Sequence, residues 1–267
     1  MTSPIIITGV GKRIGYALAK HFLAQGLSVI GTYRSHYPSI DELKTLGATL
    51  YPCDFYDDIQ VQSLIDELAK LPQIRAIIHN ASDWLPDPVL TGNEPAKSAT
   101  FAPSEVLQRM MQVHVSVPYQ LNLALEAPLR AGADGNIGAS DIIHITDYVA
   151  EKGSQKHIAY AASKAALHNM TLSFAAKLAP EVKVNSIAPA MILFNAEDNA
   201  AYQQKTLAKA LLPKEAGNEE IIDLVQYLLN SRYVTGRCHN VDGGRQLKSS
   251  ALMIKSKLFR TSARGLG

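Results

Sequence analysis

Short apolar runs rich in β-branched residues alternate with longer helical stretches, and this alternation constrains the fold of the chain more than any other feature. The expected strands are residues 4–8, 28–33, 48–53, 74–79, 141–146, 183–188 and 238–242. Four of these runs lack polar alternation, which is typical of parallel strands buried on both faces. We therefore predict an α/β fold, with a single doubly wound parallel sheet of about seven strands flanked by helices.

Two helical stretches are clear enough to place. Ile14, Leu18 and Phe22 recur at i, i+4 and i+8 and predict a helix that Gly26 caps. Residues 160–179 form an alanine-rich run that ends at a proline. These two helices follow the first and the fifth expected strands, as a doubly wound sheet requires.

Three other segments are predicted to lie outside the regular elements. Residues 85–103 and 131–140 are rich in Pro, Gly, Asn, Ala and Thr and are expected to be loops. Residues 191–217 follow a strand end and are expected to form a mobile lid over a ligand. With no internal repeat and no Gly/Ser linker, residues 1–247 are expected to be one domain.

Composition and charge indicate an ordinary, mildly acidic soluble body with a basic extension. Hydrophobic residues make up 47% of the 267 residues and charged residues 19%, which argues against disorder. The formal net charge is +2, but residues 248–267 hold five basic residues and no acid. We predict that this tail is flexible, although a short basic amphipathic helix for a membrane or a nucleic acid is the alternative.

Cysteine content and hydropathy indicate a cytoplasmic protein. The two cysteines, Cys53 and Cys238, do not make a disulfide framework and are expected to be free thiols. No apolar run approaches the length of about 18 residues that a membrane span needs. The first nine residues have no basic region and match a strand better than a signal peptide.

A glycine-rich turn joins the first expected strand to its helix. Gly9, Gly11 and Gly15 would allow the backbone to approach a pyrophosphate at the positive end of the helix, which makes the fold Rossmann-like. The spacing is one residue longer than the common dinucleotide fingerprint. A tight turn without a ligand is the alternative.

The end of the second strand favours NADP over NAD. The sequence there is TYRSH, residues 32–36, and no acid follows until Asp41. NAD-binding folds place an acid near this point to hold the ribose hydroxyls. Arg34 and Ser35, with Arg13 from the glycine turn, instead match a clamp for a 2′-phosphate, because a guanidinium pairs well with phosphate. A solvated arginine is the alternative.

Tyr160 and Lys164 lie four residues apart and so share one face of a helix. An ammonium beside a phenol favours the phenolate, so Lys164 is expected to lower the pKa of Tyr160 and to let it exchange a proton near neutral pH. The pair alone is a weak signal. It gains weight from its place after the glycine turn, the HNAS sequence at 79–82 and the strand that leads to Asp147.

The order of the motifs resembles that of the short-chain dehydrogenase/reductase family from residue 4 to about residue 246. The shared motifs are TGVGKRIG, HNAS, YAASK, VNSIAP and VTGRCHNVDGG. Longer blocks, such as TYRSHYP, HNASDW and SDIIHITDYVAEKGSQKHIAYAASKAAL, resemble the bacterial dihydromonapterin reductase branch, which is related to the pteridine reductases.

The resemblance implies roles for single residues. It implies catalysis by Tyr160, Lys164 and Asp147, and the hydride transfer that these residues would serve needs no metal. It implies that NADPH contacts Gly9, Arg13, Ile14, Gly15, Arg34, Ser35, Asp54, Asn80, Ala81, Lys164 and Pro189. It implies that a pterin substrate contacts Trp84, Asp147 and Tyr160, and that the protein is a homo-oligomer, a tetramer or a dimer.

Several positions depart from the pattern of the wider family. Arg13 replaces a glycine, as in the pteridine reductases, and Ala190 stands where a glycine usually follows Pro189. His114 stands where an asparagine usually completes a proton relay, which puts that relay in doubt. Asp147 replaces the usual serine.

Asp147 bears on the substrate. Reduction of a ketone places negative charge on an oxygen, which needs hydrogen-bond donors, and an ionised carboxylate cannot donate. Reduction of a C=N bond creates an N–H group that a carboxylate can accept. Asp147 therefore favours a nitrogen heterocycle, unless it is protonated or only orients Tyr160. Trp84, the single tryptophan, is expected to stack on the pterin ring, with core packing as the alternative.

The expected activity is NADPH-dependent reduction of 7,8-dihydromonapterin to 5,6,7,8-tetrahydromonapterin, with a weaker reduction of dihydrofolate to tetrahydrofolate. One alternative is a 3-oxoacyl-thioester or ketone reductase on the same fold. Another is an NADPH-binding sensor without turnover, although a sensor would not need the Tyr160 and Lys164 pair. The eight histidines lack the spacing of a zinc site.

Overall fold

Seven parallel strands form one sheet in a computed structural model that describes residues 3–91, 94–95, 101–134 and 139–248. The order across the sheet is β3-β2-β1-β4-β7-β8-β9. The strands are β1 (Ile5–Ile7), β2 (Val29–Tyr33), β3 (Thr49–Pro52), β4 (Ala76–His79), β7 (Ser140–Ile145), β8 (Val182–Pro189) and β9 (Cys238–Val241). The predicted fold class is confirmed, and each expected strand is present.

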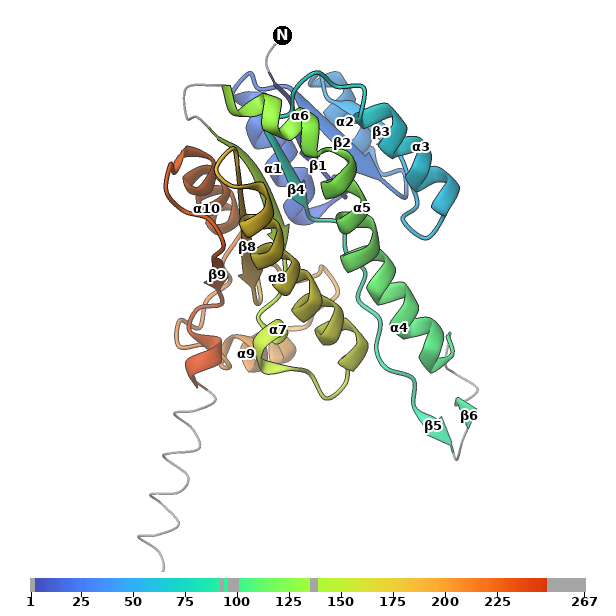
Figure 1. Ribbon diagram of the computed structural model, residues 1–267. Coiled ribbons are helices and arrows are strands. Elements are labelled where there is room, and N and C mark those ends of the chain that lie inside the picture. The colour runs from blue at the N-terminus through green and yellow to red at the C-terminus, as the bar shows by residue number, and fades with distance from the viewer. Residues whose placement is uncertain (1–2, 92–93, 96–100, 135–138, 249–267) are drawn as a thin grey trace, which may run out of the picture.

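Helices cover both faces of the sheet (Figure 1). One face packs against α1 (Arg13–Ala24), α2 (Pro38–Thr45) and α10 (Glu219–Asn230). The other packs against α3 (Asp58–Leu68), α4 (Pro103–Met111), α5 (Val117–Ala124) and α8 (Ile158–Leu178). Successive side chains of β1 point to opposite cores, Ile6 to one and Ile5 and Ile7 to the other. This is why the central strands have no polar alternation.

Two segments that the sequence predicts to be loops contain short regular elements. The first holds a small hairpin of β5 (Leu90–Thr91) and β6 (Glu94–Pro95), and the second begins with a 3₁₀ turn, Gly132–Asp134, after α6 (Glu126–Ala131). The predicted lid contains α9 (Ala200–Leu207). Elements this short carry too few periodic residues for the sequence pattern to reveal them.

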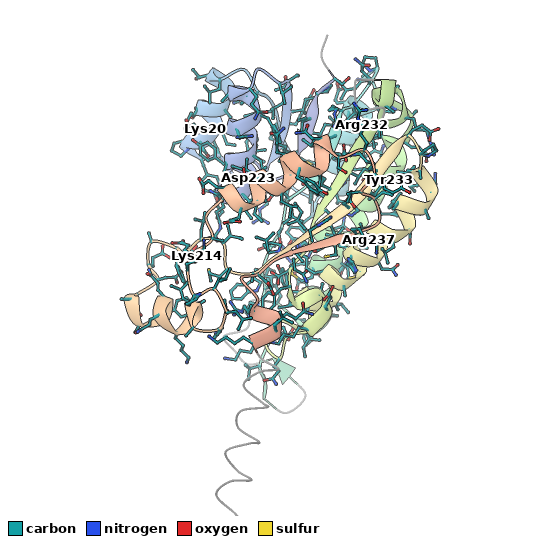
Figure 2. The ribbon with its side chains drawn as sticks, turned by 90° about the vertical axis from the view of Figure 1, so that its left-hand side faces the viewer. Lys20, Lys214, Asp223, Arg232, Tyr233 and Arg237 are labelled. Carbon is teal, nitrogen blue, oxygen red and sulfur yellow. The ribbon has the colours of Figure 1, made fainter. Side chains whose placement is uncertain are left out.

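Buried charges tie α10 to the sheet at the amino end of β7. Asp141 is fully buried and pairs with Arg75 at 2.6 Å and with Lys183 at 2.9 Å. Lys183 also donates to the carbonyl oxygens of Leu228 and Ser231, at 2.7 and 2.6 Å, at the end of α10. Cations stabilise helix C-termini in this way. Figure 2 shows this side of the molecule, with Lys20 on α1, Asp223 on α10 and Arg232 and Tyr233 beyond it.

The described residues leave two expectations untested. The predicted basic tail, 248–267, lies outside them except for Lys248, and the extent of the domain stays a prediction. Among the helices in the described ranges, none has the length and hydropathy that crossing a membrane requires.

Candidate active site

The predicted site residues collect along one edge of the sheet, where the parallel strands end. Gly9 follows β1, Arg34 follows β2, Asp54 follows β3, Asn80 follows β4 and Asp147 follows β7. Ligands of open α/β sheets bind at this carboxyl edge, where the order of the strands reverses. From β1 the strand order runs one way through β2 and β3 and the other way through β4 and β7, so the order reverses between β1 and β4. The sheet edge at this point is therefore the expected place for a ligand.

The glycine turn is held tightly by the strand next to it. The Asn80 side-chain amide donates to the carbonyl oxygens of Thr8 and Gly9, both at 3.0 Å, and the Thr8 hydroxyl accepts from the Ala81 amide at 2.9 Å. A Cβ atom on Gly15 would lie 2.2 Å from the Gly9 carbonyl oxygen, and Gly9 has a φ of +74°. Packing of the turn therefore already requires both glycines.

The start of α1 is open to an anion. Its N-cap residue, Lys12, makes no side-chain cap, and no acid lies in the first turn. By contrast, the Asp57 side chain caps α3 by accepting from the amides of Ile59 and Gln60. Free amides at a helix N-terminus bind phosphate groups.

A cleft runs from this helix start to the end of β2. It is lined by Gly9, Gly11, Lys12, Thr32, Tyr33, Arg34, Ser35, Tyr37, Cys53, Asp54, Phe55, Tyr56, Ala81, Ser82, Asp83 and Val113. Backbone amides at one end and a guanidinium and a hydroxyl at the other suit a dinucleotide that carries a further phosphate on its ribose. Five of the residues predicted for the cofactor line this cleft, namely Gly9, Arg34, Ser35, Asp54 and Ala81.

Other predicted cofactor residues have different contacts. The Arg13 guanidinium, on a backbone with φ of +55°, donates to Asn195 Oδ1 at 2.7 Å and to the Leu193 carbonyl oxygen at 2.9 Å. It thus fastens the predicted lid to the glycine turn. Ile14 packs against the core under α1, and the Pro189 carbonyl oxygen accepts from the Tyr148 amide at 3.1 Å. Their roles toward a cofactor stay predictions.

The predicted catalytic residues lie together beneath the end of β7. Tyr160 and Lys164 are buried on α8, and the Tyr160 hydroxyl donates to Asp147 Oδ2 at 2.9 Å. The other carboxylate oxygen of Asp147 accepts from the Val149 amide at 2.9 Å, which fixes its orientation. The Lys164 ammonium donates to the Ile145 carbonyl oxygen at 2.9 Å and lies 5.6 Å from the centre of the Tyr160 ring. The structure therefore assembles one phenol, one carboxyl and one ammonium.

The ionisation of this group differs from the expectation in one respect. Burial, and then the Asp147 carboxylate, raise the pKa of Tyr160 well above its ordinary value, so the expected lowering by Lys164 is wrong for this structure. Burial also raises the pKa of Asp147, and it lowers the pKa of Lys164 to about 8. The phenol thus keeps its proton and donates a hydrogen bond to the Asp147 carboxylate.

His114 occupies a π-helical turn, Gln112–Ser116, between α4 and α5, and it is wholly buried. Its Nε2 lies 2.7 Å from Ser82 Oγ and its Nδ1 lies 2.8 Å from Ser163 Oγ. Since the Ser163 hydroxyl donates to the Tyr160 carbonyl oxygen at 2.7 Å, its oxygen is left to accept from His114 Nδ1–H. Burial lowers the pKa of His114 well below its usual value, so it is a neutral link between the two serines.

Trp84 lies on the surface rather than in the core. Its ring stacks on His157 with centroids 4.0 Å apart, and the side chain remains 63% exposed. The loop that carries it is fastened to the start of α8, because Asp87 accepts from the amides of Ile158 and Ala159 at 2.6 and 3.3 Å. The alternative that Trp84 packs in the core is wrong, and its stacking on a substrate stays a prediction.

A second cavity lies between the predicted lid and the ends of β8 and β9. Its lining is Ala190, Met191, Thr206, Leu207, Ala210, Leu212, Lys214, Ala216, Glu220, Asn240, Val241, Asp242, Gly243, Gly244 and Arg245. Figure 1 shows α9 and α7 (Val149–Lys152) at the same end of the molecule. In the described part of the chain, no three His, Cys, Asp or Glu side chains gather as metal ligands would.

Comparison with known proteins identifies the family. Residues 9–246 match the protein family described as Enoyl-(Acyl carrier protein) reductase. The chain is 54% identical over 246 residues to the dihydromonapterin reductases of Klebsiella pneumoniae and Escherichia coli, which covers 92% of this chain and 97% of theirs. The chain belongs to the short-chain dehydrogenase/reductase family.

A solved structure agrees with this assignment at the level of the fold. The crystal structure of alternative dihydrofolate reductase 1 from Brucella canis, complexed with NADP, superposes with a TM-score of 0.77. It covers 92% of this short-chain reductase and 94% of the Brucella chain, at 23% identity.

The sequence did not predict several contacts around the candidate site of this short-chain reductase. Asp83 and Tyr56 line the cleft beside Arg34, and Ser82 and Ser163 hold His114. Asp83 could have been noticed, because it follows β4 at the same edge of the sheet as Asn80. The contacts of the two serines could not, since they depend on the packing of α8 and of the loop after β4 against the turn at Gln112–Ser116.

Proposed function

We propose that this protein is an NADPH-dependent dihydropterin reductase that converts 7,8-dihydromonapterin to 5,6,7,8-tetrahydromonapterin and reduces dihydrofolate more weakly. The observation that carries the proposal is the hydrogen bond between the Tyr160 hydroxyl and Asp147, at 2.9 Å. The name of the relatives, dihydromonapterin reductase, supports the same substrate class at 54% identity.

The residues along the cleft fit the cofactor. Amides at the start of α1 would hold its pyrophosphate, and Arg34 and Ser35 would hold its 2′-phosphate, since both line the cleft. Bound there, the nicotinamide supplies a hydride to C6 of the dihydropterin. Lys164, fixed by the Ile145 carbonyl oxygen, would position the ribose.

Tyr160 and Asp147 divide the remaining work. Tyr160 holds its proton firmly, because burial and Asp147 raise its pKa, and it would give that proton to N5 as the C6=N5 bond is reduced. Once Tyr160 is a phenolate, the nearby Lys164 ammonium offsets its charge. Asp147 would accept a hydrogen bond from an N–H group of the pterin ring. A ketone substrate offers no such N–H group, and its oxygen would instead need a donor such as a serine hydroxyl.

We also propose that the protein is a cytoplasmic homo-oligomer that acts on a small-molecule substrate. In this proposal it binds neither nucleic acid nor a membrane. Apolar side chains exposed on α4, α5 and α8 support the oligomer, among them Leu107, Tyr119, Leu123 and Leu172, each at least 40% exposed. Light scattering at several concentrations would test it, and a monomer at all of them would refute it.

A substrate panel tests the proposed activity. NADPH oxidation would be followed with dihydromonapterin, dihydrobiopterin, dihydrofolate and an acetoacetyl thioester in parallel. We expect dihydromonapterin to give the highest kcat/KM and the thioester the lowest. Faster turnover of the thioester would favour the ketone-reductase alternative, and NADPH binding without any turnover would favour the sensor.

A further inference from the structure

The outer end of the cleft carries an acid in direct contact with its arginine. Arg34 Nη1 lies 3.2 Å from Asp83 Oδ2. Arg34 follows β2 and Asp83 lies in the loop that follows β4, so the pair joins two loops at the carboxyl edge of the sheet. An acid here is unexpected if the arginine serves a phosphate, because a carboxylate repels one.

Asp83 is held in place by other contacts as well. The Tyr56 hydroxyl donates to Asp83 Oδ2 at 3.1 Å, and the Trp84 amide donates to Asp83 Oδ1 at 3.0 Å. The side chain of Asp83 is only 26% exposed, whereas that of Arg34 is 50% exposed. The carboxylate is therefore fixed, and the guanidinium is the partner that an incoming anion can reach.

The charges around the cleft balance. Two cations, Lys12 and Arg34, and two acids, Asp54 and Asp83, are among the residues that line it. A phosphate monoester carries a charge of about −1.5 to −2 near neutral pH and is favoured by an excess of positive charge. Each acid beside Arg34 therefore reduces the attraction that the guanidinium offers to a phosphate.

We propose that Asp83 sets the cofactor preference of this enzyme, because its carboxylate competes with the 2′-phosphate of NADPH for Arg34. The inference rests on the proposed use of NADPH. Removal of the charge on Asp83 should strengthen the binding of NADPH and leave that of NADH unchanged, since NADH has no phosphate at this place.

The substitution Asp83→Asn tests the inference, because the amide oxygen can still accept from Tyr56 or Trp84 while the negative charge is lost. Dissociation constants for NADPH and NADH would be measured on the full chain by cofactor fluorescence. We expect the Kd for NADPH to fall about threefold to tenfold, with a smaller gain at high salt. Asp66→Asn is the matched control, since Asp66 lies on α3 and contacts Gln62, away from the cleft.

Arg34→Gln separates the two proposals. If it weakens NADPH alone, the proposed phosphate site stands, and the inference is then judged on Asp83→Asn. An unchanged or higher Kd for NADPH in Asp83→Asn, or an equal change for both cofactors, would overturn the inference. If Arg34→Gln leaves NADPH binding intact, the proposed phosphate site and the inference both fail. In Arg34→Gln with Asp83→Asn, the gain for NADPH should disappear.

Discussion

Two carboxyl groups stand at opposite ends of β7 and have different surroundings, Asp141 being fully buried and Asp147 half-buried. Asp141, at the amino end, lies against two cations, Arg75 at 2.6 Å and Lys183 at 2.9 Å. Asp147, just beyond the carboxyl end, accepts a phenol hydrogen and a backbone amide, and its nearest lysine donates to a carbonyl oxygen instead. Asp141 thus pairs directly with two cations, whereas Lys164 and Arg245 attract the Asp147 carboxylate from further away.

The difference shows how stability and chemistry are divided in this fold. A buried charge that has its counter-ions fixes a helix to the sheet and gains nothing by reacting. Burial raises the pKa of both carboxyls, but Asp147 accepts a hydrogen bond from the Tyr160 hydroxyl where Asp141 accepts from two cations, and it lies where a ligand can reach it. The predictions below test this difference between Asp141 and Asp147.

Loss of the Tyr160 hydroxyl should have the largest effect at the carboxyl end. In Tyr160→Phe we expect kcat for dihydropterin reduction to fall about 100-fold to 10,000-fold, the usual contribution of a general acid. The fold should persist, because the ring remains in the core. Steady-state rates and thermal unfolding would be measured together, and an unchanged rate would remove Tyr160 from the mechanism.

Loss of the Asp141 charge should have the largest effect at the amino end. Asp141→Asn leaves Arg75 and Lys183 without their buried counter-ion, and we expect the free energy of unfolding to fall by about 3–5 kcal/mol. The kcat of the folded fraction should not change. Urea unfolding would give the free energy, with Asp66→Asn as the exposed control; a loss below about 1 kcal/mol would contradict the account.

Buried histidines between the two ends should make the fold sensitive to acid. Burial lowers the pKa of His79 from 6.5 to about 4, so the unfolded chain binds more protons between these values. Stability is therefore complete above pH 6.5 and is lost as the pH falls toward 4, by about 3 kcal/mol for this group. Urea unfolding across this range should show a free energy of unfolding that depends less on pH in His79→Gln than in the wild type, and an equal dependence in both would contradict this prediction.

Titration of Lys164 should limit the rate in alkaline solution. Its pKa is lowered to about 8 by burial, and the charged form is the one that offsets the Tyr160 phenolate. We expect kcat/KM to decline as the pH rises through about 8. A rate that stays level up to pH 10 would show that the ammonium is not needed or is held charged by the bound cofactor.

Features that depend on neighbouring residues in the chain could be predicted from the sequence, and features that depend on distant residues could not. Strand apolarity and helical spacing are local, and they located β1, β4, β7, β8 and α8 correctly. Strand ends placed Gly9, Arg34 and Asp147 at one edge. The pKa of Tyr160 was misjudged because spacing shows Lys164 on the same helix face but not the burial of both, nor the bond to Asp147.

Contacts between distant segments could not be predicted. The Ser82–His114–Ser163 chain needs the packing of α8 against the turn at Gln112–Ser116, and the Arg34–Asp83 pair needs the neighbouring positions of two loops. Arg13 shows the same limit, because its partners lie about 180 residues further along the chain.

The central claim is that the carboxyl of Asp147, bonded to the Tyr160 hydroxyl, selects a dihydropterin as the substrate. Its most direct test is the ratio of kcat/KM for dihydromonapterin to that for an acetoacetyl thioester, in wild type and in Asp147→Ser. The account predicts a high ratio in the wild type and a fall of about tenfold or more in Asp147→Ser, with the ratio unchanged in Asp141→Asn. An equal ratio in wild type and Asp147→Ser would show that the carboxyl does not select the substrate.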